Sequence, residues 1–228
     1  MRIELRHRPA HSLAVVHLDS GESLRSEAGA MVGKSTDVHV QTDGPFDKKR
    51  GGLLAGLKRS VLGGETLFTN NFTARSDGQT VHLAPALCGD MAVYDVSAGD
   101  LMIQGSSYVA SVDQVHLDSR FQGLKGLVSG ESLFFLHASG AGPVIINAFG
   151  AIEELQLDGE LIVDTGHVVA FSAGISYTVE KASDGWISSF LSGEGFVLRL
   201  SGRGVLYLQT RNPQEYGSTV GSKLPPRG

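Results

Sequence analysis

A phrase made of glycine, glutamate, an apolar run, a glycine turn and a second apolar run occurs three times along the chain. The copies lie in residues 61–83, 127–147 and 190–209. Short apolar runs predict β-strands, and a glycine turn between two of them predicts a β-hairpin whose glycine needs a positive φ. The turn glycines are Gly78, Gly142 and Gly204. This feature predicts an all-β fold built from short strands.

A second phrase alternates with the first. It has an apolar run, a glycine followed by an acidic residue, a leucine and a further glycine, and its key glycines are Gly21, Gly99 and Gly159. Because both phrases keep their order through three copies, we expect three tandem, similar β-sandwich modules in residues 1–88, 89–150 and 151–212. The alternative is chance recurrence in a glycine-rich β protein. By the same spacing, the first copy carries an insertion of about ten residues before Gly64.

The composition limits the classes of protein to consider. Thirty glycines against seven prolines in 228 residues fit many tight turns between short strands. A net charge of −5 argues against nonspecific binding of nucleic acid through an overall positive field. A single cysteine, Cys88, excludes an intrachain disulfide, and no apolar run approaches the length of a membrane-spanning helix. A cytoplasmic location is therefore expected.

A small β module is only marginally stable by itself, and association with other modules stabilises it. Each buries little apolar surface and leaves N–H and C=O groups exposed on its edge strands. Modules placed side by side cover one another, but the first and the last keep one open flank each. If the two flanks are complementary, copies of the chain associate head to tail, and the rotation must close to avoid a filament. We therefore expect a ring-like homo-oligomer, with a homotrimer as the first candidate.

The residues that carry chemistry form no catalytic or metal-binding motif. The eight histidines form neither HExxH nor a paired HxH, no GxSxG or GxxxxGK[ST] occurs, and Cys88 has only Asp90 as a charged neighbour. A carboxylate follows the key glycine in each phrase: Glu22, Glu65, Asp100, Glu131, Glu160 and Glu194. Because the repeat would hold these carboxylates apart, we interpret them as turn residues. No catalytic residue, metal or cofactor is predicted, and the chain is not expected to be an enzyme.

Residues 44–64 hold five of the nineteen basic residues together with an apolar stripe. The candidate binding residues are Lys48, Lys49, Arg50, Leu53, Leu54, Leu57, Lys58 and Arg59. In one interpretation, residues 44–63 form a flexible loop that touches an anionic membrane surface or a protein partner. In the other, which we favour, the leucines pack on the β core or on a neighbouring subunit, and the basic residues are their solvated rim.

The end of the chain has a different composition. Residues 213–228 are rich in proline, glycine and serine and have little to bury. Such a segment does not bury enough apolar surface to offset the entropy of ordering it. A disordered tail is predicted.

Several segments carry a resemblance to a known family. They are SEAGAMV (26–32), GLKRSVLGGETLFTNNF (56–72), IQGSSYVAS (103–111), VDTGHVVAF (163–171), LSGEGFV (191–197) and LQTRN (208–212). With them the chain resembles the bacterial and archaeal relatives of the mitochondrial biogenesis protein named for altered inheritance of mitochondria. The resemblance implies a triplicated β module like that of the tryptophan RNA-binding attenuation protein (TRAP-like), assembled as a trimeric ring, and it brings no catalytic residues. One departure is Arg203, where the resemblance leads us to expect proline between two glycines.

These observations favour a non-enzymatic scaffold or interaction protein. The resemblance suggests a role in membrane or envelope organisation, by analogy alone. The alternative is a ring that binds a small ligand or RNA, which the TRAP-like fold suggests. A ring that reads RNA through its repeats needs Lys or Arg at equivalent positions of every module, whereas here the basic residues concentrate in one. Nucleic acid is therefore not expected as a partner.

Overall fold

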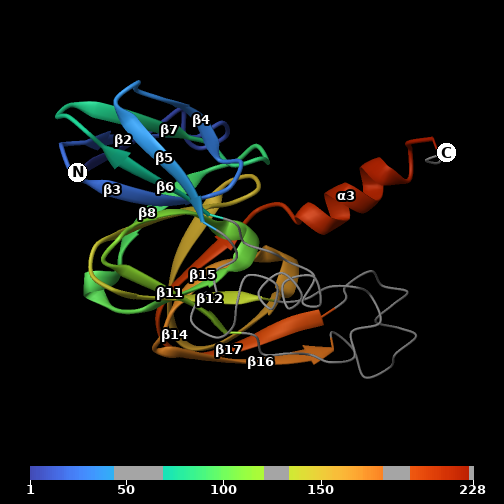
Figure 1. The fold of residues 1–228 in the computed structure, drawn as a ribbon. Coiled ribbons are helices and arrows are strands. Elements are labelled where there is room, and N and C mark those ends of the chain that lie inside the picture. Colours follow the sequence, from blue (N-terminus) through green and yellow to red (C-terminus); the bar gives the residue numbers. More distant parts are fainter. Residues whose placement is uncertain (44–68, 121–133, 182–195, 226–228) are drawn as a thin grey trace, which may run out of the picture.

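The computed structural model describes residues 1–43, 69–120, 134–181 and 196–225, and most of them form β-strands (Figure 1). Within these residues the chain has one α-helix, after the last strand. The all-β prediction is confirmed. Figure 1 shows the N-terminal strands β2, β4 and β7 at one end of the molecule and the C-terminal strands β14, β16 and β17 at the other.

Most of the strands are short. They are β1 (Arg2–Arg6), β2 (Leu13–Leu18), β3 (Ser23–Glu27), β4 (Met31–Lys34), β5 (Val38–Asp43), β6 (Thr69–Ala74), β7 (Gln79–Leu83), β8 (Met91–Asp95), β9 (Leu101–Gln104), β10 (Tyr108–Val112), β11 (Val115–Arg120), β12 (Phe135–Gly140), β13 (Pro143–Asn147), β14 (Ile152–Asp164), β15 (Val168–Ser172), β16 (Ile175–Lys181) and β17 (Phe196–Gln209). Among the described strands, only β14 and β17 exceed seven residues, and they pair with each other from Ile152–Gln209 to Asp164–Val197.

The strands form three antiparallel sheets. The first has the strand order β1-β2-β7-β4, and the second has the order β5-β6-β3-β10-β13-β8. The third has the order β11-β12-β9-β15-β17-β14, with β16 also paired to β17. The chain passes repeatedly between neighbouring sheets, since β2, β4 and β7 belong to the first sheet while β3, β5 and β6 belong to the second. These crossings tie the sheets together.

One pairing scheme occurs more than once. β7 lies between β2 and β4, and β6 lies between β3 and β5. In the same way, β13 lies between β8 and β10, and β12 lies between β9 and β11. β17 pairs with β14 throughout, with β15 through its second part and with β16 through its first part. β4, β10 and β15 therefore occupy the same place in this scheme.

The predicted β-hairpins are wrong. β6 and β7, which flank Gly78, lie in different sheets, and so do β12 and β13, which flank Gly142. Gly204 lies inside β17. Gly78 and Gly142 do have positive φ, of 72° and 108°, as the turn prediction requires. The glycine marks a turn, but the partner of each strand is decided by burial, and here the turn carries the chain from one sheet to the other.

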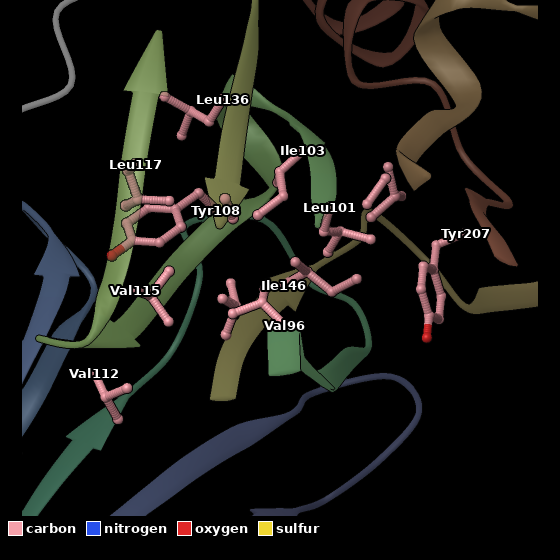
Figure 2. Packing of buried hydrophobic residues seen from close by; sticks show 14 of the residues in the cluster. Val96, Leu101, Ile103, Tyr108, Val112, Val115, Leu117, Leu136, Ile146 and Tyr207 are labelled. Atoms are coloured by element: carbon pink, nitrogen blue, oxygen red, sulfur yellow. The ribbon is translucent and has the colours of Figure 1, made fainter. Parts of the chain in front are cut away.

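Three clusters of buried apolar side chains fill the interior. Phe72 belongs to the cluster between the first and second sheets. Figure 2 shows the cluster between the second and third sheets, which Ile146 of β13 and Ile103 of β9 enter from opposite sides. The third cluster, with Phe135 and Phe171, is made wholly of residues from the third sheet. That sheet therefore bends over on itself to enclose a core.

The end of the chain differs from the prediction. Instead of disorder, residues Pro213–Gly221 form the helix α3, which extends away from the sheets in Figure 1. Its N-cap is Asn212, whose side chain accepts hydrogen bonds from the backbone N–H groups of Gln214 and Glu215. A capping asparagine followed by proline at the first helical position is a helix start signal. Local capping therefore orders a segment that buries no residue of its own.

Candidate functional site

The predicted binding loop lies outside the described residues. Lys48, Lys49, Arg50, Leu53, Leu54, Leu57, Lys58 and Arg59 all fall between β5 and β6, in residues 44–68. Segments outside the described residues also separate β11 from β12 and β16 from β17, at the corresponding places of the pairing scheme. The interaction of the basic residues with an anionic surface stays a prediction.

The repeated carboxylates do not converge where they are described. Glu22 accepts hydrogen bonds from the amino group of Met1 and from the backbone N–H of Asp19, and the first of these lowers its pKa most. Asp100 Oδ2 lies 3.0 Å from His137 Nε2, and Glu160 pairs with Arg199. Glu65, Glu131 and Glu194 lie outside the described residues. Each described carboxylate therefore serves a separate local contact.

Two strand edges carry exposed apolar side chains. The first is the outer side of β4, called the β4 edge below. β4 pairs with β7 on one side, and on its other side no strand of the described residues adds to the sheet. Met31 is 45% exposed and Val32 is 62% exposed. β4 ends in a charged residue, Lys34, but its exposed apolar side chains beside unpaired backbone groups favour the addition of another strand.

The second is the outer side of residues 160–164, called the β14 edge. β14 pairs with β17 on one side, and no strand of the described part of the chain pairs with its other side. Ile162 is 53% exposed in the middle of this segment. The β4 edge and the β14 edge belong to the first and third sheets, so one chain presents both at once.

In the pairing scheme, β10 and β15 take the place of β4, and each has a second neighbouring strand, which β4 does not have among the described strands. β10 pairs with β13 and with β3, where Ala110 lies opposite Ser26. β15 pairs with β17 and with β9, where Ala170 lies opposite Ile103. We call these two pairings, β10–β3 and β15–β9, the seams. All four of these residues are fully buried, so each seam includes a residue pair that is shielded from solvent.

A titratable group lies at the end of one seam. Glu27 is the last residue of β3, and burial of its carboxyl raises its pKa to about 7. The strand next to it, β10, contributes Tyr108, whose hydroxyl hydrogen-bonds to the backbone C=O of Arg25 and to Ser111 Oγ. Glu27 was not singled out in the sequence, because one glutamate at the end of a strand gives no signal of its burial.

The exposed apolar residues of the two edges were also missed. Met31 and Val32 stand in SEAGAMV, and Ile162 stands in an apolar run, where an apolar residue is read as core. Their exposed fractions in the folded chain show that these side chains are left in solvent. In the described part of the chain, no helix has the length and apolar character needed to cross a bilayer.

Comparisons with known proteins cover nearly the whole chain. A family model described as mitochondrial biogenesis AIM24 matches residues 3–211. The uncharacterized protein M6_Spy0233 of Streptococcus pyogenes serotype M6 is 26% identical over 231 residues, which cover 99% of this chain and 92% of that protein. The crystal structure of protein SPYM3_0169 from Streptococcus pyogenes, a structural genomics target, superposes with a TM-score of 0.81 at 24% identity, over 98% of this chain and 99% of that one. The fold is therefore shared with a solved bacterial protein.

Proposed function

The chain belongs to the mitochondrial biogenesis AIM24 family, and we propose that it works as a non-enzymatic scaffold that assembles through its own sheet edges. The proposal has two parts. First, the chain consists of three equivalent TRAP-like β modules, in residues 1–88, 89–150 and 151–212. Second, the β4 edge of one copy pairs with the β14 edge of the next copy, as strands pair at the seams.

Irregularities of the strand pairing support the equivalence of the modules. The β4–β7 ladder shifts register between Met31 and Gly33. The β10–β13 ladder shifts between Tyr108 and Ala110, and the β15–β17 ladder shifts between Val168 and Ala170. Bulges of this kind are specific features of a fold and not defects. On this basis, Val32, Val109 and Val169 are equivalent residues, each in the bulge.

The exposure of these three valines is the observation that carries the proposal. Val109 and Val169, beside the seams, are fully buried, whereas Val32 is 62% exposed. Burying a valine side chain stabilises by about 1.5 to 3 kcal/mol relative to leaving it exposed. Val32 is therefore the same residue type as the two valines buried beside the seams, but no described strand of its own chain lies next to it. A second copy, which offers the β14 edge, supplies that strand.

The seams also give the register between copies. Ser111 lies opposite Arg25, and Phe171 lies opposite Met102. Lys34 is equivalent to Ser111 and Phe171, and Ile162 is equivalent to Arg25 and Met102. The same register therefore places Lys34 opposite Ile162 of the next copy, and Gly33 opposite Val163. Such a contact is heterologous and head to tail, so it either closes into a ring or grows into a filament. We propose a ring-shaped homotrimer as the closed form.

The proposed setting is the cytoplasm, at the surface of a membrane. Resemblance to a mitochondrial biogenesis family favours membrane organisation, by analogy. The test replaces the basic residues Lys48, Lys49, Arg50, Lys58 and Arg59 by glutamine and measures co-sedimentation with anionic and neutral vesicles. If the loop contacts the membrane, the variant should bind anionic vesicles more weakly than the wild type does, and neutral vesicles equally. Unchanged binding assigns the loop to packing within the assembly.

Two single variants test the head-to-tail pairing, with the mass of the assembly measured by light scattering. We expect Val32→Asp to destroy the β4 edge and Ile162→Asp to destroy the β14 edge, so that each variant alone is a folded monomer. An equal mixture should form dimers, because V32D still offers an intact β14 edge and I162D an intact β4 edge. Leu224→Asp, at a residue 64% exposed beyond α3, is the control and should keep the wild-type mass.

The mixture separates this arrangement from others. A contact between two β4 edges leaves I162D associated on its own, and a contact between two β14 edges does the same for V32D. A wild-type chain that is monomeric at micromolar concentration, or variants that keep the wild-type mass, would refute the proposed assembly.

A further inference from the structure

A third sheet edge is unpaired, and its backbone is turned outward. β8 is the last strand of the second sheet and, among the described strands, pairs only with β13. The backbone N–H of Val96 donates to Gly142 C=O at 3.0 Å, just beyond the end of this ladder. In an antiparallel pair, hydrogen-bonded residues alternate with residues whose N–H and C=O point the other way. By this alternation, Ala92 and Tyr94 bond to β13, whereas Val93 turns its N–H and C=O to the free side.

The side chain of Val93 is also uncovered. Val93 is 41% exposed, on a strand whose neighbours Ala92 and Tyr94 pack against the cluster of Figure 2. No strand in the described ranges of the chain lies on this side of β8. We call this side, along Met91–Asp95, the β8 edge.

The first sheet shows what fits such an edge. β2 pairs with β7 in the same way that β8 pairs with β13. An additional strand, β1, pairs with the outer side of β2. Val15, the equivalent of Val93, lies opposite Glu4 of β1 and is buried. Ile3 and Leu5 of β1 pack against the same cluster as β2. β1 has no counterpart beside β8 among the described residues, so this place is filled in the first sheet and open in the second.

Charge indicates the kind of segment that the β8 edge attracts. Asp95 and Asp100 lie close enough to Tyr94 that, after burial, their negative charges help to raise the pKa of its hydroxyl. Asp95 is exposed, and its carboxylate accepts from the backbone N–H of Ser97. At the start of this edge the charge of Asp90 is paired with Arg8, so a basic side chain meets unpaired negative charge at the Asp95 end. β1 places Ile3 and Leu5 between the basic residues Arg2 and Arg6, and its central residue is Glu4, so its apolar positions and its basic ends match this requirement.

We infer that the β8 edge is a strand-addition site for an extended segment of a partner protein that alternates apolar and basic residues. The segment runs antiparallel to β8 and exchanges backbone hydrogen bonds with Val93, while its apolar residues cover Ala92 and Tyr94 as Ile3 and Leu5 cover β2. Backbone pairing supplies the affinity and the side-chain pattern supplies the selectivity.

The corresponding edge on β14 does not share these properties. Glu153 and Glu154, equivalent to Ala92 and Val93, are both exposed carboxylates. Charged side chains on an edge are a common protection against the addition of a strand. The site is therefore specific to β8. The equivalence of β2, β8 and the first part of β14 rests on the proposed modules, whereas the outward backbone of Val93 does not.

The test uses a labelled peptide, RIKLR, and fluorescence anisotropy. We expect saturable binding to the full chain that Val93→Thr keeps, because threonine has nearly the same shape and the same backbone donor. Val93→Pro removes the outward N–H without breaking a hydrogen bond to β13, which an edge strand tolerates, and should weaken binding about tenfold. The acidic peptide EIELE should not bind. Hydrogen exchange should show new protection in residues 91–95.

The outcomes separate this inference from the proposed assembly. Equal binding by V93P and V93T, or protection in residues 13–18 or 152–158 in place of 91–95, overturns the β8 site. Absence of saturable binding to the wild-type chain overturns it as well. Binding is measured on the monomeric V32D variant too, and should persist there. Peptide binding in a wild-type chain that never oligomerises would refute the assembly and leave the β8 site standing.

Discussion

Gly159 and Gly202 lie directly opposite each other in the ladder between β14 and β17. Both have positive φ, of 126° and 131°, which L side chains rarely adopt. They lie where the two long strands pass from one part of the third sheet to the other, and on both sides of them the pairing continues without a shift. The glycine pair therefore lets two strands bend together, so that one sheet encloses the cluster around Phe171.

Substitution of Gly202 should be costly. A Cβ atom on Gly202 would lie 2.5 Å from the backbone C=O oxygen of Gly174, which does not move without displacing the start of β16. We expect Gly202→Ala to lower the free energy of unfolding by about 2 to 4 kcal/mol, from steric overlap and unfavourable φ together. Chemical denaturation measures it. Gly217→Ala, in α3 with open space around it, is the control; a similar loss there would contradict this explanation.

The buried carboxylate of Asp90 should stabilise the attachment of the N-terminal segment that carries Arg8 and Ser12. Asp90 accepts hydrogen bonds from Arg8 at 2.7 and 2.9 Å, from Ser12 Oγ at 3.1 Å and from the backbone N–H of Met91 at 2.8 Å. Burial opposes the charge, yet these hydrogen bonds keep the pKa of Asp90 below its usual value.

Asp90→Asn should therefore lower stability by about 2 kcal/mol at pH 7, since the charge that pairs with Arg8 is lost. Because the folded pKa is lowered, the stabilisation is present above the unfolded pKa and disappears as the pH falls through the folded value. The difference between wild type and D90N should thus shrink in denaturation at low pH. A difference that stays constant with pH would show that Asp90 acts through packing alone. Asp118→Asn, at an exposed residue of β11, serves as the control.

The all-β class was predictable because short apolar runs and glycine turns specify strands and chain reversals locally. The partners of the strands were not predictable in this way. The turn at Gly78 has the positive φ of a hairpin, yet the strands on its two sides pair with different sheets. A local pattern fixes which residues of a strand face a core, but not which core.

The candidate edges show the same limit. Val32, Val109 and Val169 are the same residue type in similar surroundings of sequence, and only the pairing of neighbouring strands separates the exposed one from the two buried ones. The helix α3 was missed for another reason. Composition was read over the whole tail, whereas the order came from one local signal, Asn212 followed by Pro213.

That local signal gives a prediction for α3. Asn212→Ala removes the side chain that accepts from Gln214 and Glu215, which costs about 1 kcal/mol of helix stability. α3 buries no residue, and the ring of Tyr216 contacts that of Phe149. Asn212 itself adds one long hydrogen bond, 3.4 Å from its Nδ2 to Asp164 Oδ1, so the effect should stay mainly local. Hydrogen exchange in α3 should speed up while the melting temperature of the sheets is unchanged. A fall in that temperature would mean that α3 supports the fold.

Glu27 should make the fold less stable at neutral pH than in acid. Its folded pKa is about 7 and its ordinary value is 4.5, because burial disfavours the charged form. A raised carboxyl pKa means that the folded state holds its proton more tightly than the unfolded state. Stability therefore falls as the pH rises from 4.5 to 7, by roughly 3 kcal/mol as an upper value, and stays lower above that window.

Glu27→Gln keeps the size of the side chain and removes its titration. We expect E27Q to match the wild type at pH 4 and to exceed it in free energy of unfolding by about 2 kcal/mol at pH 8, measured by urea denaturation at both values. Glu153→Gln, at an exposed glutamate, should show no such dependence on pH. If E27Q is destabilised at pH 8, the carboxylate has a cationic or hydrogen-bonding partner that favours its charge, and burial is not the dominant effect at the end of this seam.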